Sequence, residues 1–145
     1  MGDAGFMGGI VVEGSPSNDT SHVIDEARMA LLLQRVANGA AAFTVREALE
    51  LATRGSASVL GRDDIGVLAP GKAADFMAGG AVHDPLAALL LCRVERVSLS
   101  VINGQVVVRD GELLTLNIDE HIARHNAIAR EMVARHPEAD RFKLV

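Results

Sequence analysis

The feature that most constrains the fold is a short apolar run at residues 10–12 that ends at Glu13. The run reads Ile-Val-Val and follows two glycines, which is typical of a strand buried on both faces in a parallel sheet covered by helices. Gly14 and Pro16 then end the run. The sequence therefore predicts a β-strand over residues 8–12 with a carboxylate at its end.

A polar loop and an amphipathic helix follow this strand. Ser17, Asn18 and Asp19 are residue types that cap the N-terminus of a helix well. Apolar residues then recur at helical spacing, at Val23, Ile24, Ala27 and Leu31. In α/β folds the loop after a strand lies at the carboxyl end of the sheet, where ligands bind. Glu13 and Asp19 are therefore predicted to lie on a ligand-binding face, although the pattern also fits a solvated strand end and a simple helix cap.

A second helix begins at the sequence Thr-Val-Arg-Glu, residues 44–47. This is a capping box, in which Thr44 and Glu47 satisfy each other's free backbone N–H groups. The apolar stripe of the helix consists of Val45, Ala48, Leu49 and Ala52. We expect Gly55 to break the helix, with one further turn that ends at Gly61.

From residue 61 onward, short apolar pieces between turn signals predict β structure. The clearest hairpin is RVSLSVINGQVVVRDGEL, residues 96–113. Its turn is Asn103-Gly104, the strongest two-residue hairpin signal, and apolar residues alternate before it. Asp110-Gly111 marks a second turn, so the sequence predicts a meander of three strands.

A closing helix is predicted over residues 119–136, capped by Asn117 or Asp119. Its expected inner face consists of Ile122, Ala129, Met132 and Val133. His121 and His125 stand four residues apart, a spacing that can hold a metal. The glutamate of the catalytic H-E-x-x-H motif is missing, so two solvated histidines are the favoured interpretation.

The composition excludes several classes of protein. The chain has 145 residues, of which 49% are hydrophobic, and these suffice for a core. A net charge of −5 and the absence of Trp and Tyr argue against a nucleic-acid polymer as partner. The longest apolar run, residues 85–92, is far shorter than the about 20 residues that span a bilayer. Cys92 lies in this run, and we expect an inert buried thiol in a cytoplasmic protein.

Four stretches of the sequence, in order, resemble the C-terminal third of a metal-dependent amidohydrolase. They are residues 5–35, 44–76, 83–92 and 97–113. The subgroup that they resemble is the cytosine/guanine-deaminase-like one, which includes 8-oxoguanine deaminases and hydroxyatrazine and chlorotriazine hydrolases. The most specific motifs are G-x-L-x-P-G-K-x-A-D at residues 66–75 and V-x-N-G-x-x-V at residues 101–107.

The resemblance implies an α/β fold that combines a (β/α)8 barrel with a small composite β-sandwich. In this family the eighth barrel strand ends in a carboxylate that binds the metal. Residues 1–60 would be the last part of the barrel, with strand eight and the helices after it. Residues 61–115 would be the C-terminal half of the sandwich, and residues 116–145 a closing helix.

The resemblance also implies a reaction and its residues. A divalent metal, zinc or iron, would lower the pKa of a bound water that attacks the amine-bearing carbon of a purine, pyrimidine or triazine ring. The family motif V-D-G-S-x-S-N-D matches residues 12–19, with Glu13 in place of the aspartate that binds the metal and takes up the proton of the water. Asp19 would be a further catalytic residue and Asn18 a substrate contact.

A complete barrel of this kind needs about 250 residues. The other metal-binding residues of the family would precede Met1, so we expect a fragment or truncated reading frame that is inactive and free of metal on its own. The intact enzyme would be a cytoplasmic homo-oligomer that acts on a small aminated heterocycle and contacts neither nucleic acid nor membrane. The alternative is a non-catalytic structural or interaction module.

Overall fold

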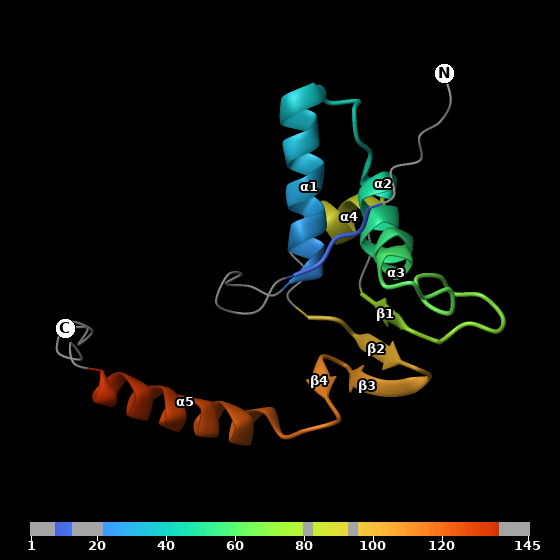
Figure 1. Cartoon of the computed structure of the whole chain (residues 1–145). Helices are drawn as coiled ribbons and strands as arrows, with labels where there is room; N and C mark the ends of the chain where they lie inside the picture. The colour runs from blue at the N-terminus through green and yellow to red at the C-terminus, as the bar shows by residue number, and fades with distance from the viewer. Residues whose placement is uncertain (1–7, 13–21, 80–82, 93–95, 137–145) are drawn as a thin grey trace.

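The computed structural model describes residues 8–12, 22–79, 83–92 and 96–136 (Figure 1). Its helices are α1 (Val23–Asn38), α2 (Val45–Glu50), the π-helix η1 (Leu51–Gly55), α3 (Ser56–Val59), α4 (Pro85–Leu91) and α5 (Ile118–Arg135). Its strands are β1 (Phe76–Ala78), β2 (Leu99–Ile102), β3 (Gln105–Arg109) and β4 (Glu112–Leu113). The helices α1 to α4 form one group, the sheet lies beside it, and α5 extends away from both (Figure 1). The chain therefore has the expected mixture of helices and strands of an α/β protein.

The helix group is built around a small apolar core. Its fully buried members come from α1, α2 and α4: Ala27, Leu31, Ala48 and Leu90. Arg28 fastens α1 to α4, because its Nε donates to the carbonyl of Leu90 at 3.0 Å and its Nη2 to that of Leu91. Among the described residues only six hydrophobic side chains are buried, so the core is smaller than the composition suggests.

The N-terminal cap of α2 is the one predicted from the sequence, whereas that of α1 is a different residue. At α2 the predicted capping box forms: Glu47 N donates to Thr44 Oγ1 at 3.2 Å, and Thr44 N donates to Glu47 Oε2 at 2.7 Å. At α1 the cap is His22, whose Nδ1 accepts from Asp25 N at 3.3 Å. The helix thus begins later than the expected caps, residues 17–19, which lie outside the described residues.

The prediction that Gly55 breaks the second helix was wrong. The chain runs from α2 through η1 into α3 with helical dihedral angles, and Gly55 itself has φ −60° and ψ −48°. Glycine disfavours a helix interior by only about 1 kcal/mol, which tertiary packing can offset. The helix ends where expected, because Gly61 adopts a left-handed φ of +65° that suits a residue without Cβ.

The four strands form one antiparallel sheet in the order β1-β2-β3-β4. The predicted hairpin is confirmed: Asn103 and Gly104 both have positive φ, 48° and 76°, as a type I′ turn requires. Asp110 and Gly111, with φ of 52° and 81°, repeat this geometry between β3 and β4. The expected three-strand meander therefore forms, with the three residues of β1 added at its edge.

The segment at residues 8–12 is not a strand in the structure, contrary to prediction. A parallel strand needs neighbouring strands to satisfy its backbone groups, and the sheet of the described residues consists of β1 to β4 alone. Ile10 bonds to a side chain of the helix group instead. The expected burial on both faces is also absent, because Val11 is 63% exposed.

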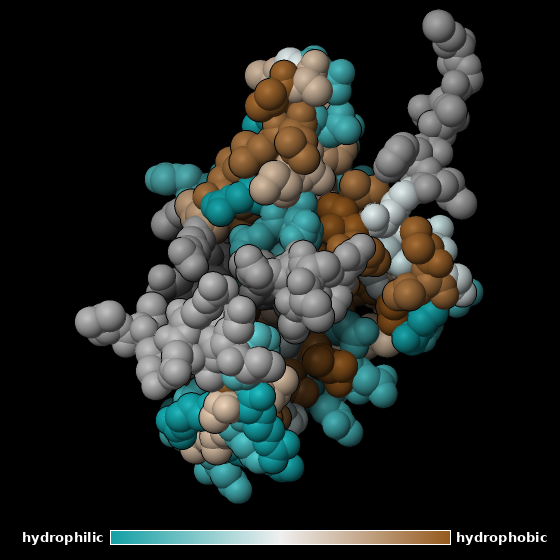
Figure 2. Space-filling view, turned by 60° about the vertical axis from the view of Figure 1, so that its left-hand side comes forward, coloured by the Kyte–Doolittle hydropathy of each residue, from teal (hydrophilic) through white to brown (hydrophobic). Residues whose placement is uncertain are grey.

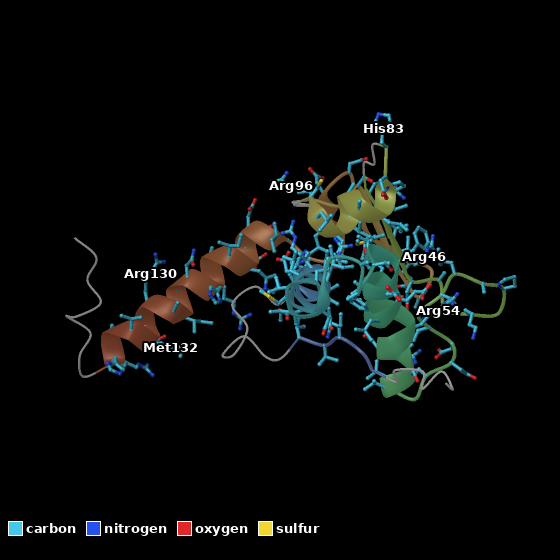
Figure 3. All side chains as sticks on the ribbon, turned by 90° about the horizontal axis from the view of Figure 1, so that it is seen from above. Arg46, Arg54, His83, Arg96, Arg130 and Met132 are labelled. Carbon is cyan, nitrogen blue, oxygen red and sulfur yellow. The ribbon has the colours of Figure 1, made fainter. Side chains whose placement is uncertain are left out.

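The inner face of the closing helix and the thiol of Cys92 were predicted to be buried, and both predictions were wrong. The helix α5 begins at the predicted cap Asn117, but it has no buried residue, and its expected inner face includes Met132, which is 69% exposed. Figure 3 shows Met132 and Arg130 on a helix that stands clear of the helix group. Cys92 is exposed because it follows the last turn of α4, at the surface. No helix in the described part of the chain is both long and apolar enough to cross a membrane.

Candidate active site

The site residues predicted from the sequence, Glu13, Asn18 and Asp19, lie outside the described residues. The structure does describe the segment that leads to them, residues 8–12, and the helices on which this segment rests. Figure 1 shows the segment crossing in front of α1 and the stack of α2 and α3. The contacts that hold residues 8–12 therefore constrain where the predicted site residues, which follow them in the chain, can lie.

The hydroxyl of Ser56, at the start of α3, binds both backbone groups of Ile10. Ile10 N donates to Ser56 Oγ at 3.1 Å, and Ser56 Oγ donates to Ile10 O at 2.7 Å. The carbonyl of Leu51 lies 3.3 Å from the same oxygen. One side chain thus replaces the strand partners that Ile10 lacks among the described residues.

The two faces of the segment differ in environment. The side chain of Ile10 packs against the buried core of the helix group, whereas that of the next residue, Val11, is exposed. Val12 is again partly buried. This is the alternation of an extended chain, in which successive side chains point to opposite faces. One face of the segment is therefore fixed to the helices and the other is free.

An open groove of about 750 Å³ lies beside the segment. The groove is lined by Gly8, Gly9, Ile10, Ala30, Leu33, Gln34, Phe43, Glu47, Glu50, Leu51 and Gly55. Its charged lining is acidic, because Glu47 and Glu50 of α2 border it, whereas Arg46 and Arg54 lie on the side away from α1 (Figure 3). Hydrogen bonds from Thr44, first its hydroxyl and then its backbone N–H, lower the pKa of Glu47, so this carboxylate is charged at neutral pH.

The described part of the chain does not form a metal centre by itself. No group of three or more His, Cys, Asp or Glu side chains in that part is arranged to hold an ion. His121 and His125 are both exposed on α5, in agreement with the solvated interpretation. Asp84 caps α4, since its Oδ1 accepts from Ala87 N at 2.9 Å.

Sequence reasoning missed Ser56 as a residue that bears on the site. A signal was present: the pair Gly8-Gly9 ahead of the apolar run and the pair Gly55-Ser56 in the second helix. Small residues at both places allow two backbones to approach closely. Only the tertiary structure shows that these two pairs meet.

The sequence profile of the amidohydrolase family matches residues 1–107. This chain belongs to the amidohydrolase family. The match includes the segment 8–12, the helix group and most of the sheet, while α5 lies beyond it.

Among curated proteins, this amidohydrolase chain is 47% identical over 138 residues to the 8-oxoguanine deaminase of Pseudomonas aeruginosa. That alignment covers 90% of the chain and 31% of the relative. The chain is 36% identical over 151 aligned residues to the hydroxydechloroatrazine ethylaminohydrolase of Pseudomonas sp. strain ADP, with 94% and 31% covered. The chain thus spans about a third of the length of these relatives.

Solved structures show the same fold. Atrazine chlorohydrolase from Arthrobacter aurescens TC1, complexed with zinc, matches with a TM-score of 0.75 and 37% identity, over 86% of this chain and 30% of that one. An adenosine deaminase from Xanthomonas campestris with bound zinc matches with a TM-score of 0.73 and 27% identity, over 81% and 29%. Zinc is therefore found in amidohydrolases similar to this chain.

Proposed function

We propose that this chain is the C-terminal part of a metal-dependent amidohydrolase that deaminates a purine, pyrimidine or triazine ring by hydrolysis. The observation that carries the proposal is the 47% identity to an 8-oxoguanine deaminase over 90% of the chain. The fold supports it, because a triazine hydrolase and an adenosine deaminase are structural neighbours. The intact enzyme would be a cytoplasmic homo-oligomer whose substrate is a small aminated heterocycle.

The proposed organisation has three parts. Residues 1–60 would complete the barrel of the enzyme, residues 61–115 would be half of the composite β-sandwich, and residues 116–145 the closing helix. The antiparallel sheet supports the second part and the separate α5 supports the third, although α4, which belongs to the second part, packs with α1 and α2 of the first. Since the chain spans about a third of its relatives, the remaining parts of the barrel would come from outside it.

Glu13 is the proposed proton shuttle and metal ligand. The family motif supports this role, because Glu13 stands at the position where the family has the aspartate that binds the metal. There a carboxylate can take up the proton of the attacking water and pass it to the departing amine, which leaves as ammonia. Asp19 would assist the reaction and Asn18 would contact the substrate.

A hybrid enzyme tests the proposal. Residues 1–145 would replace the matching 31% of the P. aeruginosa 8-oxoguanine deaminase, and release of ammonia from 8-oxoguanine would be measured. We expect activity in the hybrid and its loss in Glu13→Ala, while the exposed Glu112→Ala on β4 serves as the matched control. The 145-residue chain alone should contain no stoichiometric zinc or iron by elemental analysis and release no ammonia.

Three outcomes would change the conclusion. A hybrid that is folded by circular dichroism but inactive would favour the alternative, a non-catalytic structural or interaction module. Activity that survives Glu13→Ala but not Asp19→Ala would assign the proton shuttle to Asp19. Stoichiometric zinc in the isolated chain would show that its own residues complete a metal site.

A further inference from the structure

The junction between residues 8–10 and the start of α3 is built for close approach. A Cβ added to Gly9 would lie 2.7 Å from Ser56 Cα and 2.9 Å from Ser56 N. A Cβ added to Gly55 would lie 2.2 Å from the carbonyl oxygen of Gly8. Because all these neighbours are backbone atoms, neither position accepts a side chain without moving the main chain. The segment therefore rests directly on the helix backbone.

The close approach of the glycines sets how near the segment lies to the helices, and the hydroxyl of Ser56 sets its register along them. It accepts from the N–H of Ile10 and donates to the carbonyl of the same residue, so a slip of one residue would break both bonds. Ser56 itself is anchored, because its neighbour Ala57 is 4% exposed. The junction thus defines which residue of the segment lies at which place.

We propose that Ser56 is a positioning residue for Glu13, an inference that rests on the proposed function. Glu13 is three positions after Ile10 in the sequence, and three steps of chain span at most about 11 Å, so the carboxylate-bearing residue can lie no further than that from the held backbone. Ser56 does not touch the substrate. It fixes the register of the segment, and the register sets the reach of the Glu13 side chain.

The first test concerns the junction and needs no activity. Hydrogen exchange of peptides that cover residues 8–12 would be measured in the 145-residue chain, comparing Ser56→Ala with Ser58→Ala. Ser58 is an exposed serine on the same helix, so its variant controls for the loss of a hydroxyl. We expect exchange about tenfold faster in Ser56→Ala and unchanged in Ser58→Ala. Equal exchange in the two variants would overturn the inference.

The second test separates positioning from general stability. In the hybrid enzyme, Ser56→Ala should lower kcat about tenfold with KM unchanged, because misplacing a catalytic group by about 1 Å can cost up to about 100-fold. The same substitution would then be made in a Glu13→Asp background. If Ser56 acts through residue 13, the factor should differ at least threefold between the two backgrounds.

The outcomes that test the positioning role of Ser56 can be told apart from those that test the proposed function. An unchanged kcat in Ser56→Ala, or the same factor in both backgrounds, would overturn the positioning role while the parent hybrid remains active. A folded but inactive parent hybrid would overturn the proposed function and, with it, the catalytic part of this inference. The exchange measurement would still decide whether Ser56 holds residues 8–12.

Discussion

The carboxylate of Asp75 accepts a hydrogen bond from the backbone N–H of Asn103, with 2.6 Å between Oδ1 and N. Next to it, Gly104 N donates to Ala74 O at 3.0 Å. Asp75 ends the motif at residues 66–75, and Asn103-Gly104 is the turn of the hairpin, so the two most specific motifs of the sequence meet. Their contact ties the entry of β1 to the turn between β2 and β3.

Removing this carboxylate should loosen the sheet. Asp75→Ala leaves Asn103 N–H without its acceptor, and we expect a loss of about 1 kcal/mol in the free energy of unfolding, the usual net value of one hydrogen bond. Asp75→Asn retains the Oδ1 acceptor and should cost less. Urea titration monitored by circular dichroism would measure both variants. The control is Asp63→Ala. An equal loss of unfolding free energy in Asp75→Ala, Asp75→Asn and Asp63→Ala would show that the Asp75 hydrogen bond does not stabilise the sheet.

Truncation of Leu31 should be the most damaging single change to α1. Leu31 has 0% of its surface exposed and lies in the core shared with Ala48 and Leu90. Leu31→Ala should therefore lower the free energy of unfolding by about 2–5 kcal/mol, through lost transfer energy and the cavity left behind. Leu33→Ala, on the same helix but 60% exposed, should cost less than about 0.5 kcal/mol. Similar losses in thermal or urea unfolding would contradict the described core.

The N-terminus of α2 should weaken in acid. Hydrogen bonds from Thr44 lower the pKa of Glu47 in the folded chain, so its carboxylate binds a proton more readily when unfolded. The resulting stability is present above the ordinary pKa of a glutamate and is lost as the pH falls through the lower folded value. Glu47→Gln keeps an acceptor but does not titrate, so stability curves against pH should differ between this variant and the parent in that window. Parallel curves would show that the capping box contributes no pH dependence.

The isolated chain should self-associate. At the C-terminal end of α1, Leu33 and Val36 are 60% and 86% exposed, and Figure 2 shows hydrophobic side chains over this upper part of the molecule. Exposed apolar patches of this kind promote association. Light scattering at high concentration should give a mass above 15.3 kDa, which the double variant Leu33→Gln, Val36→Gln should reduce. Leu68→Gln, a change at an exposed loop leucine, is the control and should have no such effect.

The sequence by itself determined the features that depend on a few neighbouring residues. The capping box of Thr44 and Glu47 and the turn at Asn103-Gly104 formed as predicted, because their partners are at most three residues apart and their conformations follow from local chemistry. The ordered motifs also sufficed to identify the family, since they are a property of the sequence alone. The predicted roles of Glu13, Asn18 and Asp19 stay predictions.

Only the tertiary structure decided the features whose partners lie far along the chain. Residues 8–12 carry the pattern of a buried strand, but a strand exists only where another strand pairs with it, and here Ser56, 46 residues after Ile10, takes that place. Gly55 is helical, and its lack of a Cβ leaves room for the carbonyl of Gly8, which packs against it. Cys92 is exposed because α4 ends there. Periodicity shows which residues can be buried, but what covers them depends on contacts between distant segments that no local pattern contains.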